Sequence, residues 1–255
     1  MKFLVGYHTD NGIRKKENQD SLLIKTARSP YGRIGLFAVC DGMGGLSAGE
    51  LASSTVIRGF GEWFDLDLTS INFNEIDDVE IFNIIDDKVR ELNNRILQYG
   101  ESKEERLGTT LTMMLIVDNK GYIFQVGDSR VYRIGKTLEQ LTVDQSFVQR
   151  EIERGNLTKE EALTHPKKNV LLQCVGAKKR VDVKMDVIEI EDEQVYLICS
   201  DGFYRRLKED EIVKSLNYDK FNSSNEISSM AKELTELVKS RKEQDNITAI
   251  VVKVK

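Results

Sequence analysis

Three strand-like apolar runs in this sequence end in an aspartate that has a glycine beside it. The aspartates are Asp41, Asp128 and Asp201, and a fourth, Asp245, comes just before the last apolar run. Runs of this kind are typical of buried strands. An exit from one strand and an entry into its antiparallel neighbour lie at the same edge of a sheet. The four carboxylates can therefore converge, and this pattern constrains the fold more than any other.

The first run, FAVCDGMGG at residues 37–45, also has a simpler interpretation. Asp-Gly is a common turn dipeptide, so Asp41-Gly42 alone is equally compatible with a turn after a buried strand. The recurrence of the same pair at Asp201-Gly202 favours a functional role. A glycine after Asp41 would also leave its backbone carbonyl accessible as a ligand.

Converging carboxylates repel one another unless a cation lies between them. Every candidate ligand is an oxygen, which favours a hard ion, Mg²⁺ or Mn²⁺, over Zn²⁺. Two such ions can hold a bridging hydroxide and screen a phosphoryl group. A nearby cation, Arg14 or Lys15, can then bind the phosphate oxygens. The residues thus predict metal-assisted hydrolysis of a phosphoester.

Composition argues against several other functions. The net charge of −5 disfavours nucleic-acid binding driven by charge. No apolar stretch is long enough to span a membrane, and the N-terminus becomes polar too early for a signal peptide. Three cysteines, an odd number, indicate reduced thiols in a cytoplasmic compartment, where buried small side chains are favoured over a nucleophile. Only two histidines are present, which disfavours a zinc site.

Hydrophobic periodicity predicts strands and helices in turn. The expected strands cover residues 2–9, 21–24, 35–40, 111–118, 122–126, 131–134, 138–141, 181–190, 194–200 and 247–254. The expected helices cover about 47–64, 75–99, 208–216 and 224–241. The first of these helices has a capping-box pattern, Ser47 with Glu50. Hairpin turns are expected near residues 28–32 and at 119–121.

A polar excursion at about residues 142–163 separates two groups of expected strands. It contains Gly155-Asn156 and two short helical patterns, residues 146–154 and 159–162. A segment of this length between strands is typical of a mobile subdomain or lid. An ordered element is expected again over residues 169–176.

Eight short motifs resemble the metal-dependent protein serine/threonine phosphatases of type 2C, in their small bacterial single-domain form. In chain order the motifs are ENQDS (17–21), FAVCDGMGG (37–45), GTT (108–110), VGDSRVYRI (126–134), LTVDQS (141–146), THP (164–166), ICSDG (198–202) and DNIT (245–248). Each motif is weak alone. Their order, and their spread over almost the whole chain, make the resemblance specific.

The resemblance implies an α+β fold, a four-layer α-β-β-α sandwich in which helices flank two central antiparallel sheets. The metal site then lies at one end of the sandwich. A single catalytic domain is implied over residues 1–255, with a flap at about 144–168 that borders the substrate cleft. No motif encodes the oligomeric state; no extra interaction domain is attached, so we expect a monomer, located in the cytoplasm.

The resemblance also implies roles for individual residues around two ions, Mn²⁺ or Mg²⁺. Asp41 takes the position that bridges the two ions, and the Gly42 carbonyl binds the second. Asp201 and Asp245 match the other carboxylate ligands of the first ion. Asp20 matches a carboxylate that holds metal-bound water at the second.

Other positions depart from the family pattern or extend it. Asp128 matches the ligand of a third, weaker ion in bacterial members. Lys15 stands where many members have an arginine, which leaves the phosphate ligand open between Arg14 and Lys15. Gln19 stands where many members have a glutamate, so the second ion has one carboxylate fewer and is expected to bind less tightly.

The proton donor for the leaving group has no assigned residue. Met43 occupies a position that is histidine in animal relatives, and a methionine cannot donate a proton. His165, at the boundary of the flap, is one candidate, although a structural His-Pro turn is the favoured interpretation of THP. A metal-bound water is the other candidate.

The function implied is hydrolysis of phosphoserine and phosphothreonine by attack of a metal-bridging water or hydroxide. Phosphorylated proteins are the expected partners, with a cognate Ser/Thr kinase among them by family analogy. One alternative is a catalytically weak regulatory or phosphoprotein-binding module on the same fold. Loss of a metal carboxylate would indicate it, whereas Asp41, Asp201 and Asp245 are all present. A hydrolase of small phosphoesters is a third possibility.

Overall fold

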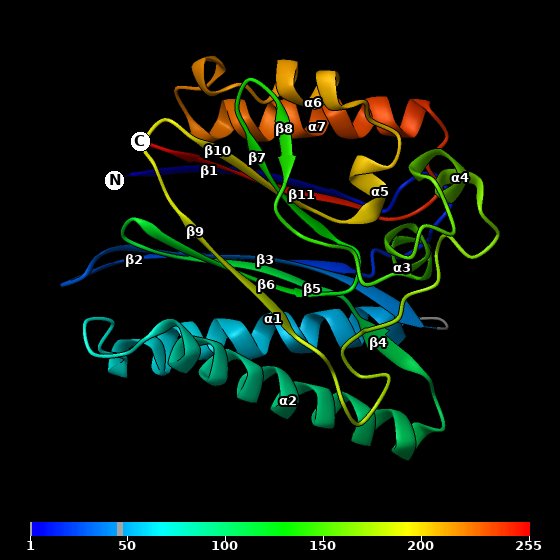
Figure 1. The fold of residues 1–255 in the computed structure, drawn as a ribbon, viewed down its shortest axis with the longest axis horizontal. Helices are drawn as coiled ribbons and strands as arrows, with labels where there is room; N and C mark the ends of the chain where they lie inside the picture. The colour runs from blue at the N-terminus through cyan, green and yellow to red at the C-terminus, as the bar shows by residue number, and fades with distance from the viewer. Residues whose placement is uncertain (1, 45–47) are drawn as a thin grey trace.

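Two antiparallel sheets lie face to face at the centre of the fold, and helices cover the outer face of each (Figure 1). The computed structural model describes residues 2–44 and 48–255. The predicted α+β fold, a four-layer α-β-β-α sandwich, is confirmed. Both chain termini lie at one end of the sandwich (Figure 1). No helix in the described ranges is long and apolar enough to cross a membrane.

The first sheet is built from the two ends of the chain and from three strands between residues 130 and 199. Its strands are, in spatial order, β1 (Phe3–Asp10), β11 (Ile247–Val254), β10 (Val195–Cys199), β7 (Arg130–Ile134) and β8 (Leu138–Gln140). All its pairings are antiparallel. The central strand pair β10–β11 is buried along its whole length, and its sequence is apolar apart from Thr248 and Lys253 of β11.

The second sheet is built mostly from the first half of the chain. Its strands are, in spatial order, β2 (Asp20–Ser29), β3 (Gly32–Gly44), β5 (Leu111–Val117), β6 (Lys120–Val126) and β9 (Lys184–Glu189), and the short β4 (Leu107–Thr109) pairs with the end of β3. The hairpin turn between β5 and β6 lies at Asp118-Asn119, one residue earlier than predicted, with Asp118 in the left-handed region at φ 51°.

Helices form the two outer layers. α1 (Ala48–Leu66) and α2 (Asp78–Lys103) cover the second sheet, while α5 (Asp201–Tyr204), α6 (Glu209–Ser215) and α7 (Ser224–Ser240) lie over the first (Figure 1). The predicted cap at Ser47 lies outside the described residues. α2 begins three residues later than expected because Asp77 and Glu80 form a capping box.

The sequence of β3 is apolar at successive positions, without the alternation of polar and apolar residues that is typical of a strand with one exposed face. Leu36, Ala38 and Cys40 pack toward α1 and α2, whereas Phe37 and Val39 pack against the other sheet. Successive side chains of a strand point to opposite faces, and here both faces are buried. Layers on both sides therefore fix β3 in place.

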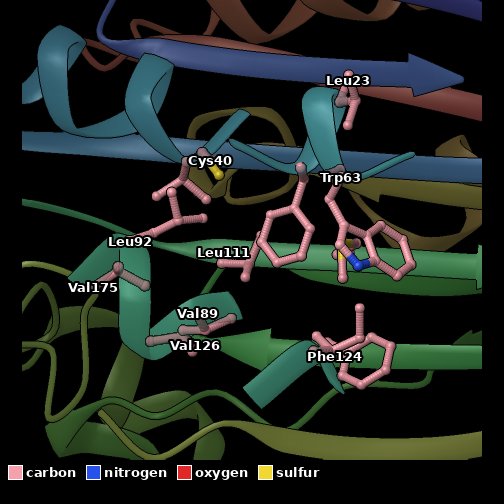
Figure 2. Close-up of a cluster of buried hydrophobic side chains, with 14 of the residues drawn as sticks. Leu23, Cys40, Trp63, Val89, Leu92, Leu111, Phe124, Val126 and Val175 are labelled. Carbon is pink, nitrogen blue, oxygen red and sulfur yellow. The ribbon is translucent and has the colours of Figure 1, made fainter. Parts of the chain in front are cut away.

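Figure 2 shows the cluster of buried side chains between the second sheet and its helices. Trp63 of α1 and Leu92 of α2 meet Leu111 and Phe124 of the sheet, with the thiol of Cys40 among them. The cysteine therefore acts as a small buried apolar side chain. Burial raises the pKa of this thiol far above its usual value, which disfavours a nucleophilic role.

Several predicted boundaries were wrong. β3 does not end at Asp41 but continues to Gly44, because β4 supplies pairing partners for residues 42–44. The turn interpretation of Asp41-Gly42 is therefore wrong. The ordered element expected over residues 169–176 consists of isolated bridges at Leu171 and Val175.

Candidate active site

Five aspartates from the two sheets and their connections form an acidic cluster: Asp20, Asp41, Asp128, Asp201 and Asp245. The register of the second sheet sets Asp20 directly opposite Asp41. In the first sheet, Asp201 follows β10 and Asp245 precedes its antiparallel neighbour β11. Asp128 lies in the connection from β6 to β7. The predicted strand ends are thus brought to one region, and β2 adds Asp20 to it.

Burial and mutual repulsion raise the pKa values of several of these carboxylates. Burial raises the pKa of Asp41 well above its usual range, and the charges of all four other aspartates raise it further. Burial, together with the charges of Asp201 and Asp245, raises the pKa of Asp20 to about 7. Burial also raises the pKa of Asp128 to about 8. Such crowding is costly without a cation among the carboxylates.

Two of the carboxylates have an oxygen that no hydrogen bond satisfies. Within the described ranges, Asp20 Oδ1 and Asp201 Oδ1 are buried without a hydrogen-bond partner. A buried, unsatisfied carboxylate oxygen is costly, and oxygen donors suit a hard divalent ion. The residues present therefore fit the Mn²⁺ or Mg²⁺ that the sequence predicts.

Side-chain cations already compensate part of this charge. Lys15 Nζ lies 3.1 Å from Asp245 Oδ1. Arg205 Nη2 lies 2.8 Å from Asp201 Oδ2 and 3.2 Å from Asp128 Oδ2. No group of three or more acidic, histidine or cysteine side chains in residues 2–44 and 48–255 is arranged as a ready metal site. An ion held by Asp245 Oδ1 would have to displace Lys15 from that oxygen.

Close packing of backbones explains the glycine in both Asp-Gly pairs. A Cβ at Gly42 would lie 2.5 Å from the carbonyl oxygen of Gln19 and would overlap that of Gly49 in α1. A Cβ at Gly202 would overlap the carbonyl oxygen of Asn246. Each glycine thus lets another segment of the site approach the residue that follows the aspartate.

Substitution of Gly42 by alanine should destabilise the protein, because the added methyl group forces α1 and the Gln19 backbone away from β3. We expect a loss of about 1–3 kcal/mol or more in the free energy of unfolding. Gly61→Ala is the matched control. Its Cβ would meet only Leu23, at 3.6 Å, in the middle of α1, so it should gain about 0.5–1 kcal/mol. Denaturant unfolding measures both; equal stability of Gly42→Ala and wild type would contradict this account.

Hydroxyl groups of the GTT and GDS motifs hold Asp41 in place. Thr110 Oγ1 accepts the Asp41 N–H at 2.8 Å, and Thr109 Oγ1 donates to the Asp41 carbonyl at 2.9 Å. Thr110 Oγ1 also pairs with Ser129 Oγ at 2.9 Å, next to Asp128. These motif residues position the carboxylates and do not have to contact substrate.

Residues of the DNIT and ICSDG motifs hold the loop that precedes β2, and Asp20 at the start of β2, in place. Asn246 Nδ2 donates to the carbonyls of Asn11 and Glu17, and Asn246 Oδ1 accepts the N–H of Gln19. Ser200 Oγ donates to Asp20 Oδ2 at 2.8 Å. Sequence reasoning did not assign these roles; the only signal was that both residues belong to the recognised motifs.

The two candidate phosphate ligands differ in their partners. Arg14 Nη1 donates to the neutral Gln244 Oε1 at 2.9 Å, whereas Lys15 compensates the charge of Asp245. Both side chains are exposed on the loop beside the carboxylates. Arg14 is therefore the cation whose charge is less engaged in this arrangement.

His165 is engaged within the flap. Its ring stacks on Phe147 with centroids 5.5 Å apart, and its Nδ1 accepts the N–H of Lys167. These contacts support the structural His-Pro turn. Met43 pairs with Gly108 across β3 and β4. Met43 has no proton to donate, and the contacts of His165 named above lie within the flap.

The predicted flap contains α3 (Phe147–Glu153) and α4 (Lys159–Thr164). Its base is closed by backbone hydrogen bonds between residues 145–147 and 170–172. It is anchored beside Asp128, because Gln145 exchanges two hydrogen bonds with Gly127 and Asp144 binds Arg130 through both carboxylate oxygens.

Comparison with known proteins agrees with this architecture. Residues 8–239 match the sequence model of the family protein phosphatase 2C. Over 260 residues the chain is 30% identical to the serine/threonine phosphatase stp of Listeria welshimeri, covering 96% of this chain and 94% of that protein. The Streptococcus agalactiae serine/threonine phosphatase superposes with a TM-score of 0.85 at 28% identity over 100% of both chains.

A further solved structure bears on the metal. The catalytic domain of the serine/threonine phosphatase PstP, in complex with two manganese ions, superposes with a TM-score of 0.78 at 28% identity over 99% of each chain. The chain described here belongs to the protein phosphatase 2C family, whose members are metal-dependent serine/threonine phosphatases. The predicted family and enzyme class are confirmed, and phosphoproteins are the substrates that this class implies.

Proposed function

We propose that this chain hydrolyses phosphoserine and phosphothreonine in proteins at a centre of two divalent ions, Mn²⁺ or Mg²⁺. The supporting observation is the cluster of five crowded aspartates in which Asp20 Oδ1 and Asp201 Oδ1 are buried without a partner in the described ranges. When bound, the ions would acidify a water and screen the charge of the phosphoryl group.

The chain's own residues have distinct tasks in this proposal. Asp41 would hold both ions, and its backbone is fixed by Thr109 and Thr110. Asp201 and Asp245 would be further ligands of the first ion, while Asp20 and the Gly42 carbonyl would serve the second. These positions match what the family resemblance implies.

The test is hydrolysis of an aryl phosphate and of a phosphothreonine peptide, each with Mn²⁺ and with EDTA. We expect turnover of both with Mn²⁺ and none with EDTA. No turnover with Mn²⁺ would instead favour the regulatory or phosphoprotein-binding module. Turnover of the aryl phosphate alone would favour a hydrolase of small phosphoesters.

We propose Arg14 as the main phosphate ligand, because Lys15 is engaged with Asp245 and a guanidinium can bind two phosphate oxygens at once. Arg14→Ala should raise KM for the phosphopeptide by about tenfold, the effect of losing about 1.4 kcal/mol, and Lys15→Ala should raise it less. Lys16→Ala, on the same loop, is the control. A larger rise for Lys15→Ala would reverse the assignment.

We propose that the chain acts as a monomer in the cytoplasm and that a Ser/Thr kinase of the same cell is among its substrates. The family assignment supports the phosphoprotein substrate, since the class acts on phosphoproteins. Size-exclusion chromatography with light scattering tests the monomer.

A further inference from the structure

Arg205 lies between two buried carboxylates of the acidic cluster. Its Nη2 is 2.8 Å from Asp201 Oδ2 and 3.2 Å from Asp128 Oδ2. The Arg205 side chain is 25% exposed, whereas those of Asp128 and Asp201 are 6% and 10% exposed. One guanidinium nitrogen thus occupies the space between both carboxylates, where little water can replace it.

The surrounding structure fixes this guanidinium. The single turn α5 places Arg205 four residues after Asp201, so both side chains lie on one helix face. Arg205 Nη1 donates to Asn169 Oδ1 at 2.8 Å, and the neighbouring Tyr204 hydroxyl donates to the Asp128 carbonyl at 3.1 Å. The other nearby guanidinium, Arg130, is taken by Asp144. Arg205 is thus the cation that serves the Asp128–Asp201 pair.

The two oxygens of Asp201 are used differently. Oδ2 is paired with Arg205, whereas Oδ1 is one of the buried, unpartnered oxygens in the described part of the chain. Asp201 can therefore bind an ion through Oδ1 while it keeps Arg205. Asp128 differs, because a divalent ion shared with Asp201 Oδ2 would have to displace the guanidinium and leave it near a second positive charge.

We propose that Arg205 is a built-in cation that neutralises the Asp128–Asp201 pair, closes that pair to divalent ions and limits the centre to two ions. The inference rests on the two-ion centre proposed above. It replaces the third ion that the family resemblance implies at Asp128. Asp128 then orients Arg205, and Arg205 links the acidic cluster through Asn169 to the segment that follows the flap.

The experiment counts the Mn²⁺ ions bound per chain by calorimetric titration. Paramagnetic resonance of the free Mn²⁺ then measures the same number independently. Wild type should saturate at two ions. Arg205→Met, which keeps the bulk and removes the charge, should bind a third ion, and adding Asp128→Asn should remove it. Arg205→Lys should restore two ions. Arg90→Met is the control, because Arg90 also pairs with an aspartate four residues before it, on the remote helix α2.

Three ions bound to wild type, or two bound to folded Arg205→Met, would overturn the proposal. Asp128→Asn alone provides a second test that leaves Arg205 in place. It should leave the count at two, and the loss of one ion would show that Asp128 is a ligand. Fewer than two ions on wild type would overturn the two-ion centre itself, so the two failures are distinguishable.

Discussion

Replacement of Asp41 by asparagine is expected to abolish Mn²⁺-dependent phosphatase activity while the protein stays folded. Asp41 is proposed to contact both ions, so its loss weakens the whole centre. Even indirect partners of metal ligands change affinity or activity by about 10–100-fold, and we expect a fall in kcat of at least about 100-fold. Initial rates on a phosphothreonine peptide at saturating Mn²⁺ measure it.

The same substitution has a second signature that separates loss of the site from loss of the fold. Without metal, Asp41→Asn removes a charge whose folded-state pKa is raised by burial and by four like charges. At neutral pH that charge destabilises the folded state, so the metal-free variant should unfold at a higher temperature than wild type. Asp65→Asn, a surface site paired with Lys25, is the control. Activity retained in Asp41→Asn would show that the centre is misplaced.

Addition of Mn²⁺ should stabilise the wild-type protein strongly. A ligand that binds only the folded state at about 100 times its Kd contributes about 2.7 kcal/mol. For a chain of this size each kcal/mol raises Tm by about 2–4 °C, so one ion should raise Tm by roughly 5–10 °C. Relief of the repulsion among the aspartates is the physical source of this gain.

Thermal unfolding with Mn²⁺, with Mg²⁺ and with EDTA measures the effect. Asp41→Asn should lose most of the rise in Tm caused by Mn²⁺, whereas Arg90→Met on α2 should keep it. An equal rise in wild type and in Asp41→Asn would place the stabilising ion elsewhere on the chain.

Much of the fold could be predicted because burial on two faces leaves a strong pattern. Strands β10 and β11 are largely apolar runs, and their antiparallel pairing brings Asp201 and Asp245 to one edge. The pairing of Asp20 with Asp41 could not be predicted, because strand register depends on contacts between distant segments.

The rest of the site depends on tertiary contacts that leave little local signal. Residues 41–44 have low strand propensity, yet they extend β3 because β4 pairs with them. An arginine four residues after an aspartate is common on exposed helix surfaces. Nothing in the spacing of Arg205 indicated that α5 would turn it toward Asp128.

The central claim is that two divalent ions bind on either side of Asp41. Anomalous scattering from Mn²⁺-soaked crystals, recorded near the manganese edge, tests it most directly. The account predicts two anomalous peaks with the Asp41 carboxylate between them, one beside Asp201 and Asp245 and the other on the side of Asp20. An anomalous map without a peak beside Asp41, from crystals at saturating Mn²⁺, would contradict it.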